Sequence, residues 1–268
     1  MVHISEIELK TKKGHVSFSE VKDFVDCSFL HKKKHIEKLD FFEENVYTNF
    51  GTAVHASCED YIETREMKHE ISLDLIKESW EEHELPEMSL WLERSNLILD
   101  KVPEWLEDRF PGWEAVRAEE DLMEPIPGVH TNVKFKGFID AIIKHGDEYW
   151  IIDWKTSANG WNDYKRKDDK LKMQLIFYNH FWSKKHNIDP EKINCGFVIL
   201  NRELLAPERI DFFTFKITEE DRKKSITVLN NMLGHVKRGK SFKKWKYGNP
   251  QYQGACRFCD FNGTKHCP

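Results

Sequence analysis

The stretch that decides the fold runs from Lys134 to Lys155 and reads KFKGFIDAIIKHGDEYWIIDWK. Both of its halves are rich in β-branched and aromatic residues, and the pair Gly146-Asp147 separates them. Such a pair between two apolar runs is typical of a β-hairpin turn. The stretch therefore predicts an antiparallel hairpin with strands over residues 138–144 and 149–155.

The predicted hairpin brings two carboxylates together. If the turn is symmetric, Asp140 and Asp153 are direct cross-strand neighbours, with Cβ atoms roughly 5 Å apart. Because side chains alternate along a strand, Lys155 lies on the same face as Asp153, about 7 Å further on. Three apolar residues of the second strand take the opposite face, which we expect to be packed: Trp150, Ile152 and Trp154.

Two neighbouring carboxylates among apolar residues repel each other, and burial raises the free energy of ionising both. A divalent cation between them removes this penalty, and an oxygen-rich site with few protein ligands suits magnesium or manganese. A cation held in this way can activate water and neutralise a phosphate. The alternative interpretation is a pair of exposed acids at the edge of a hairpin.

The composition is that of a soluble globular protein. Of the 268 residues, 32% are charged and 40% are hydrophobic, which suits one α/β core with a helical elaboration. The apolar runs are too short to span a bilayer and no signal-peptide core is present, so we expect an intracellular, cytoplasmic protein without a membrane partner. In that compartment the six cysteines indicate metal ligands or buried thiols rather than disulfides.

The net charge of -5 argues against a uniformly basic DNA-coating protein. A nuclease remains possible because its active site needs acids and its phosphate contacts need only local positive charge. Basic runs occur at residues 31–35, 165–172 and 237–246. The last run contains Phe242, Trp245 and Tyr247, a pattern that suits single strands bound by their backbone and stacked on rings. Solvated faces and a basic tail are the alternative explanation.

Capping and periodicity predict the other elements. Ser17 to Glu20 fits a capping box, which predicts a short helix over residues 18–29 with Cys27 near its end. A helical pattern broken near Pro86 and Pro103 covers residues 71–110. The remaining expected elements are helices over residues 48–66, 169–185 and 219–237 and strands over residues 113–124, 194–201 and 209–218.

Three cysteines near the end of the sequence have the spacing of a metal site. Cys256, Cys259 and Cys267 cannot complete a tetrahedral thiolate site, so a fourth ligand is required. A zinc ribbon, with His266 as a ligand, and an iron-sulfur cluster are both compatible with this spacing.

Six sequence elements resemble, in order, those of the PD-(D/E)xK nucleases. Four are short motifs: GTAVH at residues 51–55, GFID at 137–140, IDWK at 152–155 and QLIFY at 174–178. The other two are Cys27 and the group of three C-terminal cysteines. The chain resembles most closely the RecB-like branch, which includes the CRISPR-associated iron-sulfur adaptation nuclease and the AddB-type nuclease domain.

The resemblance implies a set of site residues. The implied metal ligands, for magnesium or manganese, are His55, Asp140, Asp153 and the backbone carbonyl of Trp154. Lys155 would position the attacking water, Gln174 would brace the site, and Tyr178 would help to hold DNA. As a ligand, His55 would be a neutral imidazole that titrates near neutral pH. Either Glu119 or Glu120 could add a carboxylate, and the sequence does not say which.

The resemblance also implies an architecture. The expected fold is a restriction-endonuclease-like α/β core, with a mixed central sheet flanked by helices, in a single domain over residues 1–268. Residues 67–112 would form a helical insertion that roofs a DNA channel. Cys27 would join the three C-terminal cysteines around a 4Fe-4S cluster that links the N- and C-terminal segments, with a structural role.

Family behaviour points to an exonuclease acting on single-stranded DNA or frayed ends. The expected processes are recombination, repair, CRISPR adaptation or phage DNA processing, with a possible protein partner in a recombination or CRISPR adaptation complex. The alternatives are a non-catalytic DNA-binding or partner-binding subunit on the same scaffold and a structure-specific endonuclease. The intact set of Asp140, Asp153 and Lys155 favours an enzyme.

Overall fold

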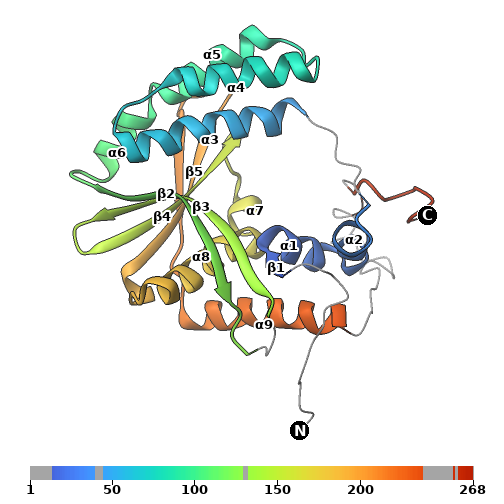
Figure 1. The fold of residues 1–268 in the computed structure, drawn as a ribbon. Helices are drawn as coiled ribbons and strands as arrows, with labels where there is room; N and C mark the ends of the chain where they lie inside the picture. The colour runs from blue at the N-terminus through green and yellow to red at the C-terminus, as the bar shows by residue number, and fades with distance from the viewer. Residues whose placement is uncertain (1–13, 40–44, 129–131, 238–255, 257–258, 268) are drawn as a thin grey trace. The chain divides into compact units, whose positions relative to one another are not determined.

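The computed structural model describes residues 14–39, 45–128, 132–237, 256 and 259–267 (Figure 1). Contacts divide the chain into two compact units. The first comprises residues 1–43, 122–137 and 219–268, and the second comprises residues 44–121 and 138–218. Most of the basic run at residues 237–246, including Phe242 and Trp245, lies outside the described residues. No helix in the described part of the chain is both long and apolar enough to cross a membrane.

A mixed sheet forms the centre of the second unit. Its strands are, in spatial order, β3 (Lys134–His145), β4 (Glu148–Ser157), β5 (Ile193–Asn201) and β6 (Ile210–Thr214), and β2 (Glu114–Pro125) pairs with β3. The β3/β4 and β5/β6 pairs are antiparallel, whereas β4 and β5 are parallel. The predicted α/β fold with a mixed sheet is therefore confirmed, although β6 is shorter than the strand expected over residues 209–218.

The register of the hairpin is the predicted one. Ala141 faces Ile152, and the pairing continues to His145 and Glu148 beside the turn. Asp140 and Asp153 lie one step beyond the last pair of this ladder. There the carboxylate of Asp140 accepts a hydrogen bond of 2.8 Å from the backbone N–H of Trp154. The two acids thus lie directly beyond the paired part of the hairpin.

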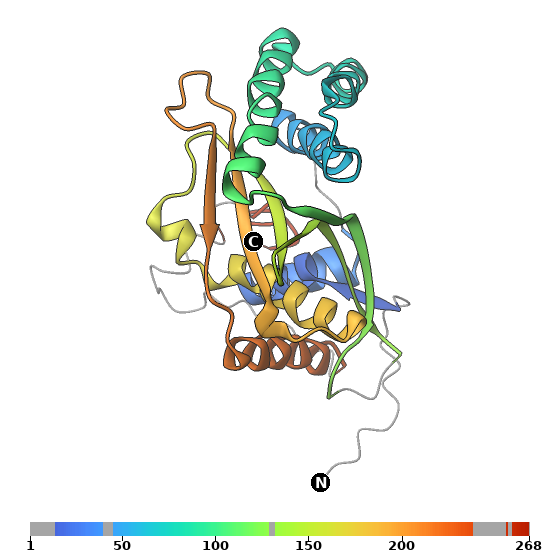
Figure 2. The ribbon, with the colours of Figure 1, turned by 90° about the vertical axis from the view of Figure 1, so that its left-hand side faces the viewer.

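Helices cover both faces of this sheet (Figures 1 and 2). On one side lie α3 (Val46–Thr64), α4 (His69–Glu82), α5 (Met88–Leu99) and α6 (Val102–Arg109). Their apolar residues share a core with Ile152 and Trp154, and Trp150 packs against its edge, so the predicted packed face of β4 is confirmed. On the other side lies α8 (Asp169–His186), which contacts β4 and β5.

The predicted helical insertion consists of α4, α5 and α6. Pro86 lies in the first break between these helices, as expected. The second break falls at Asp100 and Lys101 rather than at Pro103, because Pro103 occupies the first turn of α6, where its missing N–H costs nothing. Trp80 and Trp91 are buried in contact with each other, so they pack α4 against α5.

Two short elements complete the second unit. The helical turn α7 (Asp163–Arg166) lies in the polar segment after β4, and the 3-10 turn η2 (Pro190–Lys192) precedes β5. Side-chain caps begin both: Asn162 accepts a hydrogen bond from the backbone N–H of Lys165, and Asp189 accepts one from that of Glu191.

The first unit contains short helical elements around Cys27. Its elements are β1 (His15–Ser17), α1 (Phe18–Asp26), α2 (Ser28–His31), the π-helical turn η1 (Lys32–Ile36) and α9 (Glu219–Lys237). Ser17 caps α1 through the N–H of Glu20, as predicted. The single helix expected over residues 18–29 is wrong, because Cys27 is extended (φ -162°, ψ 115°) and separates α1 from α2.

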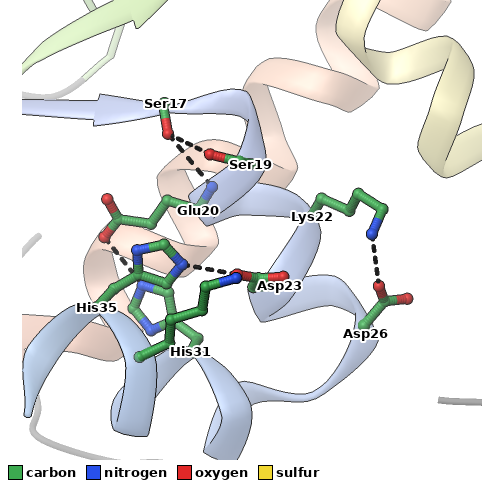
Figure 3. A network of polar contacts seen from close by, with 9 residues as sticks. Ser17, Ser19, Glu20, Lys22, Asp23, Asp26, His31 and His35 are labelled. Atoms are coloured by element: carbon green, nitrogen blue, oxygen red, sulfur yellow. Dashed lines mark hydrogen bonds and ion pairs between the residues drawn. The ribbon is translucent and has the colours of Figure 1, made fainter. Parts of the chain in front are cut away.

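A network of polar contacts fixes the chain on both sides of this break (Figure 3). His31 Nε2 lies 3.0 Å from a carboxylate oxygen of Glu20, and His35 Nε2 lies 2.7 Å from one of Asp23. Burial raises the pKa of Asp23, but the hydrogen bond from His35 and the charge of Lys34 outweigh it and lower the pKa below its ordinary value. The residues after Cys27 are thereby tied to α1.

Candidate active site

The residues predicted to form the site come together in the second unit. His55 projects from α3, Asp140 from β3, and Asp153 from β4. His55 Nδ1 lies 3.8 Å from Asp140 Oδ2. Two further predicted residues, Lys155 on β4 and Gln174 on α8, contact Asp153. Because all these elements belong to one unit, the site is defined by a single sheet and the helices packed on it.

Asp153 is fully buried, and side chains occupy both of its oxygens. The ammonium group of Lys155 forms an ion pair with Oδ2. Gln174 Nε2 donates a hydrogen bond of 2.7 Å to Oδ1 and lies 3.2 Å from the hydroxyl of Tyr178. Gln174 and Tyr178 are four residues apart and therefore share one face of α8, where Gln174 fixes the orientation of the buried carboxylate.

The electrostatics of the site indicate an excess of negative charge. Burial raises the pKa of Asp153 to about 6, although Lys155 opposes the shift, and Asp140 raises it further. Burial also raises the pKa of Asp140, with a contribution from Glu119. Both carboxylates would ionise more easily with a further positive charge beside them.

His55 is neutral over the physiological range. Burial and the positive charge of Lys155 lower its pKa to about 4, with Asp153 acting in the opposite direction. The expected titration near neutral pH is therefore wrong, because that expectation took no account of burial or of Lys155. A neutral imidazole is the form that binds metal ions.

Glu59 belongs to the site and was missed by the sequence analysis. Ligand atoms of His55, Glu59 and Asp140 all lie within 4.8 Å of one another. Burial raises the pKa of Glu59 to about 8, with contributions from Asp140, Glu119 and Glu63. The available signal was its spacing, since a residue four positions after His55 lies on the same face of a helix.

The structure distinguishes Glu119 from Glu120. Glu120 forms ion pairs with Lys185 at 2.7 Å and His186 at 3.0 Å. Glu119 lies in the left-handed region (φ 47°) and close enough to Asp140 and Glu59 to raise both of their pKa values. A cleft of about 590 Å³ lies beside Glu59 and Glu119. Glu119 is therefore the member of the pair that adds negative charge to the site.

The donor set of the site fits a hard divalent cation. One neutral imidazole and two carboxylates within 4.8 Å form a group of the kind that holds magnesium or manganese. Burial is the main cause of the raised pKa values of Glu59, Asp140 and Asp153, with smaller contributions from neighbouring carboxylates, and a cation beside them would lower these pKa values. Asp153 stands outside the group of three, because Lys155 and Gln174 hold it, and its role as a ligand stays a prediction.

Cysteines of the first unit form a second candidate metal centre. Burial raises the pKa of Cys259, and the neighbouring thiols of Cys267 and Cys27 raise it further. Neither these cysteines nor Cys256 forms a disulfide. The structure thus brings Cys27 to the C-terminal cysteines, as four-thiolate coordination requires.

A mixed sheet that presents two acids and a lysine beside a helical histidine is the arrangement expected of a phosphodiester-cleaving nuclease. The chain belongs to the PD-(D/E)XK nuclease superfamily, whose sequence model matches residues 15–264. That match includes all the residues of the site described above.

Two solved structures are similar to the chain. One is a protein from Eubacterium rectale, described provisionally as an exonuclease, with a TM-score of 0.57 and 16% identity over 95% of this chain and 92% of that chain. This likeness shows a shared fold. The other, the protein designated SSO0001, has a TM-score of 0.43 and 15% identity over 97% of this chain and 87% of that chain. No curated protein sequence matches the chain significantly.

Replacing Glu59 with glutamine is expected to stabilise the metal-free protein at pH 8 while weakening its affinity for manganese. The folded-state pKa of about 8 exceeds the ordinary value of 4.5. Between these pH values Glu59 stays protonated in the folded protein but ionises in the unfolded chain, so the free energy of unfolding falls as pH rises. Glutamine removes that cost, and we expect the Tm at pH 8 to rise by on the order of 2 °C or more.

Differential scanning calorimetry at pH 6.5 and pH 8, with and without manganese, measures this effect. Glu81→Gln is the control, because Glu81 is an exposed acid of the neighbouring helix α4 and lies outside the group of three. A Glu59→Gln variant that is less stable at pH 8, or that binds manganese as the wild type does, would show that Glu59 is not part of a cation site.

Proposed function

We propose that the protein is a magnesium- or manganese-dependent deoxyribonuclease of the RecB-like branch. The observation that carries this proposal is the group of His55, Glu59 and Asp140 beside the buried pair of Asp153 and Lys155. Membership of the nuclease superfamily supplies the reaction class, which is hydrolysis of a phosphodiester. Cleavage requires a site for a cation and a positive group beside it, and the group of three and Lys155 would supply them.

Each residue of the site has a definite task in this mechanism. His55, Glu59 and Asp140 would hold the cation, with Asp153 and the backbone carbonyl of Trp154 as further ligands. A bound magnesium or manganese ion polarises the phosphate and lowers the pKa of a coordinated water. Lys155 positions the attacking water and stabilises the charge that develops on the phosphate.

Hydrogen bonds from neighbouring groups hold the carboxylates of Asp140 and Asp153 in place. The N–H of Trp154 fixes one oxygen of Asp140, and Gln174 fixes one oxygen of Asp153. Tyr178 stays protonated, because burial raises the pKa of its phenol far above the ordinary value. The Tyr178 hydroxyl beside Gln174 can therefore donate a hydrogen bond to DNA.

The proposed substrate is single-stranded DNA or a frayed DNA end, digested exonucleolytically. An intracellular role in recombination, repair, CRISPR adaptation or phage DNA processing, and a protein partner in such a complex, follow from the resemblance to the RecB-like branch. The non-catalytic subunit and the structure-specific endonuclease remain the competing functions.

Degradation of end-labelled linear single strands by the pure protein tests the proposal. We expect digestion that requires magnesium or manganese, with closed-circular single strands left intact. Cleavage of the circles would identify an endonuclease instead. Binding of DNA and manganese without any cleavage would identify a non-catalytic subunit.

We propose further that Cys27, Cys256, Cys259 and Cys267 hold a 4Fe-4S cluster, with zinc as the alternative. Support comes from the proximity of Cys27 and Cys267 to Cys259 and from the lack of a disulfide at each of the four cysteines, all of which lie among the described residues. A shared cluster would close a chain loop of more than about two hundred residues and restrict the unfolded state. Its role would be structural.

Replacing Cys27 with serine is expected to remove the iron, the brown colour and part of the stability of the anaerobically purified protein. Serine provides no thiolate, so the fourth ligand is lost. Iron content, the visible spectrum and Tm measure the outcome. Cys195→Ser is the control, because Cys195 is a buried thiol of β5 in the second unit. Zinc in place of iron would select the alternative, and a wild-type protein free of both metals would refute the centre.

A further inference from the structure

A second cleft lies in the part of the second unit that follows the active-site strand. Its volume is about 930 Å³, and residues 158–161, directly after β4, form part of its lining. Asn201, the last residue of β5, and Arg94 of α5 also line it. Since Lys155 lies near the same end of β4, a strand of DNA at the active site would have this cleft as its continuation.

Three cations lie at or beside this cleft, and each rests on an aromatic ring. The distances are 4.6 Å from Arg94 Cζ to the Trp91 ring, 4.7 Å from Lys165 Nζ to the Trp161 ring and 4.6 Å from Arg202 Cζ to the Tyr47 ring. Contacts of this kind hold a cationic side chain in place without neutralising its charge. The three groups are therefore positioned and still charged.

These positive charges extend from the active site. Burial lowers the pKa of Lys165, and the charges of Lys155 and Arg202 lower it further. Burial also lowers the pKa of Arg202, with Arg94 adding to the shift against the opposing charge of Glu203. The order Lys155, Lys165, Arg202, Arg94 is thus a series of neighbouring like charges.

Carboxylates match two of these four charges, because Lys155 forms an ion pair with Asp153 and Arg94 lies close to Glu203. Asp211 is occupied by an ion pair with Arg166. The carboxylate of Glu203 lies 3.9 Å from Arg94. Within the described part of the chain, neither Lys165 nor Arg202 forms an ion pair with a carboxylate. Like charges held together in this way fit a polyanion, whose phosphates would remove their mutual repulsion.

We propose that Lys165, Arg202 and Arg94 bind successive phosphates of one DNA strand whose scissile bond lies at Lys155. This inference rests on the proposed nuclease function and deepens it, because it names the residues that hold the substrate beyond the cut. Two exposed apolar side chains, Tyr164 and Leu205, are 90% and 96% accessible near the same cleft. Such surfaces suit the unstacked bases of a single strand rather than a duplex.

Binding of a labelled oligothymidylate in the presence of EDTA tests the series without cleavage. Arg202→Gln and Lys165→Gln should each weaken binding about 3- to 10-fold at low salt and reduce the salt slope by about 0.7. Glu203→Gln should tighten binding, because it removes the opposing charge. Arg109→Gln is the matched control and should have no effect, since Arg109 also lies on a ring, 5.3 Å from Phe212, but is not among the charges that shift the pKa of Lys165 or of Arg202.

The outcomes separate this inference from the proposed function. If the variants lose affinity as expected but the wild type cleaves no DNA with manganese, the series stands and the nuclease proposal fails. If Arg202→Gln and Lys165→Gln bind like Arg109→Gln, the series is refuted whatever the activity. An equal loss of affinity for blunt duplex DNA would refute the assignment to single strands. With activity present, Arg202→Gln should raise KM on long strands and leave kcat unchanged.

Discussion

Replacing Asp153 with asparagine is expected to lower the rate of DNA cleavage by at least about 10³-fold. The carboxylate lies fully buried between Lys155 and Gln174, where a neutral amide binds a cation more weakly and cannot balance the charge of the lysine. Asparagine has nearly the same shape, so the sheet should keep its structure. Initial rates on linear single strands with manganese, together with the circular dichroism spectrum, measure the effect.

Asp147→Asn is the control for this experiment. Asp147 is an exposed acid in the turn of the same hairpin, outside the pairing of the strands. The Asp147→Asn protein should cleave DNA at the wild-type rate. An Asp153→Asn protein that is folded and still cleaves DNA would rule out the assigned site.

Replacing Lys155 with methionine is expected to lower cleavage by about 10²- to 10³-fold and, in addition, to tighten manganese binding. Burial lowers the pKa of Lys155, but the charges of Asp153 and Asp140 outweigh it and raise the pKa overall. The ammonium group therefore competes with a metal ion for the same carboxylates. Methionine keeps the length of the side chain without the charge.

Isothermal titration calorimetry measures the expected gain in manganese affinity, and initial rates measure the expected loss of cleavage. Lys144→Met, in the first strand of the hairpin opposite Tyr149, serves as the control and should change neither. A Lys155→Met protein that binds manganese more weakly than the wild type would show that the lysine supports the cation rather than competing with it.

Local patterns were sufficient to predict the central hairpin and the face shared by Gln174 and Tyr178. Alternation along two short strands and a two-residue turn determine which residues face each other, and the observed pairing of Ala141 with Ile152 follows from them. Likewise, a spacing of four on a helix brings Gln174 next to Tyr178. These features depend on few residues close in sequence, so tertiary packing did not alter them.

The sequence analysis did not predict the features that depend on residues far apart in the chain. The spacing from His55 places Glu59 on the same face of the helix, but only the proximity of Asp140, which is far along the chain, makes it a candidate ligand. Glu120 forms ion pairs with Lys185 and His186, which are far along the chain, and these ion pairs distinguish it from Glu119. The break at Cys27 lies beside histidines held by acids of the preceding helix, a tertiary network that periodicity does not reveal.

Crystals soaked in manganese test the central claim most directly, because neighbouring buried acids call for a bridging cation. We predict an anomalous difference peak in contact with Asp140 and His55, with Glu59 or Asp153 completing the ligands. A fully occupied soak that leaves no peak beside Asp140, or that shows the acids of β3 and β4 pointing away from each other, would contradict a metal-dependent nuclease site here.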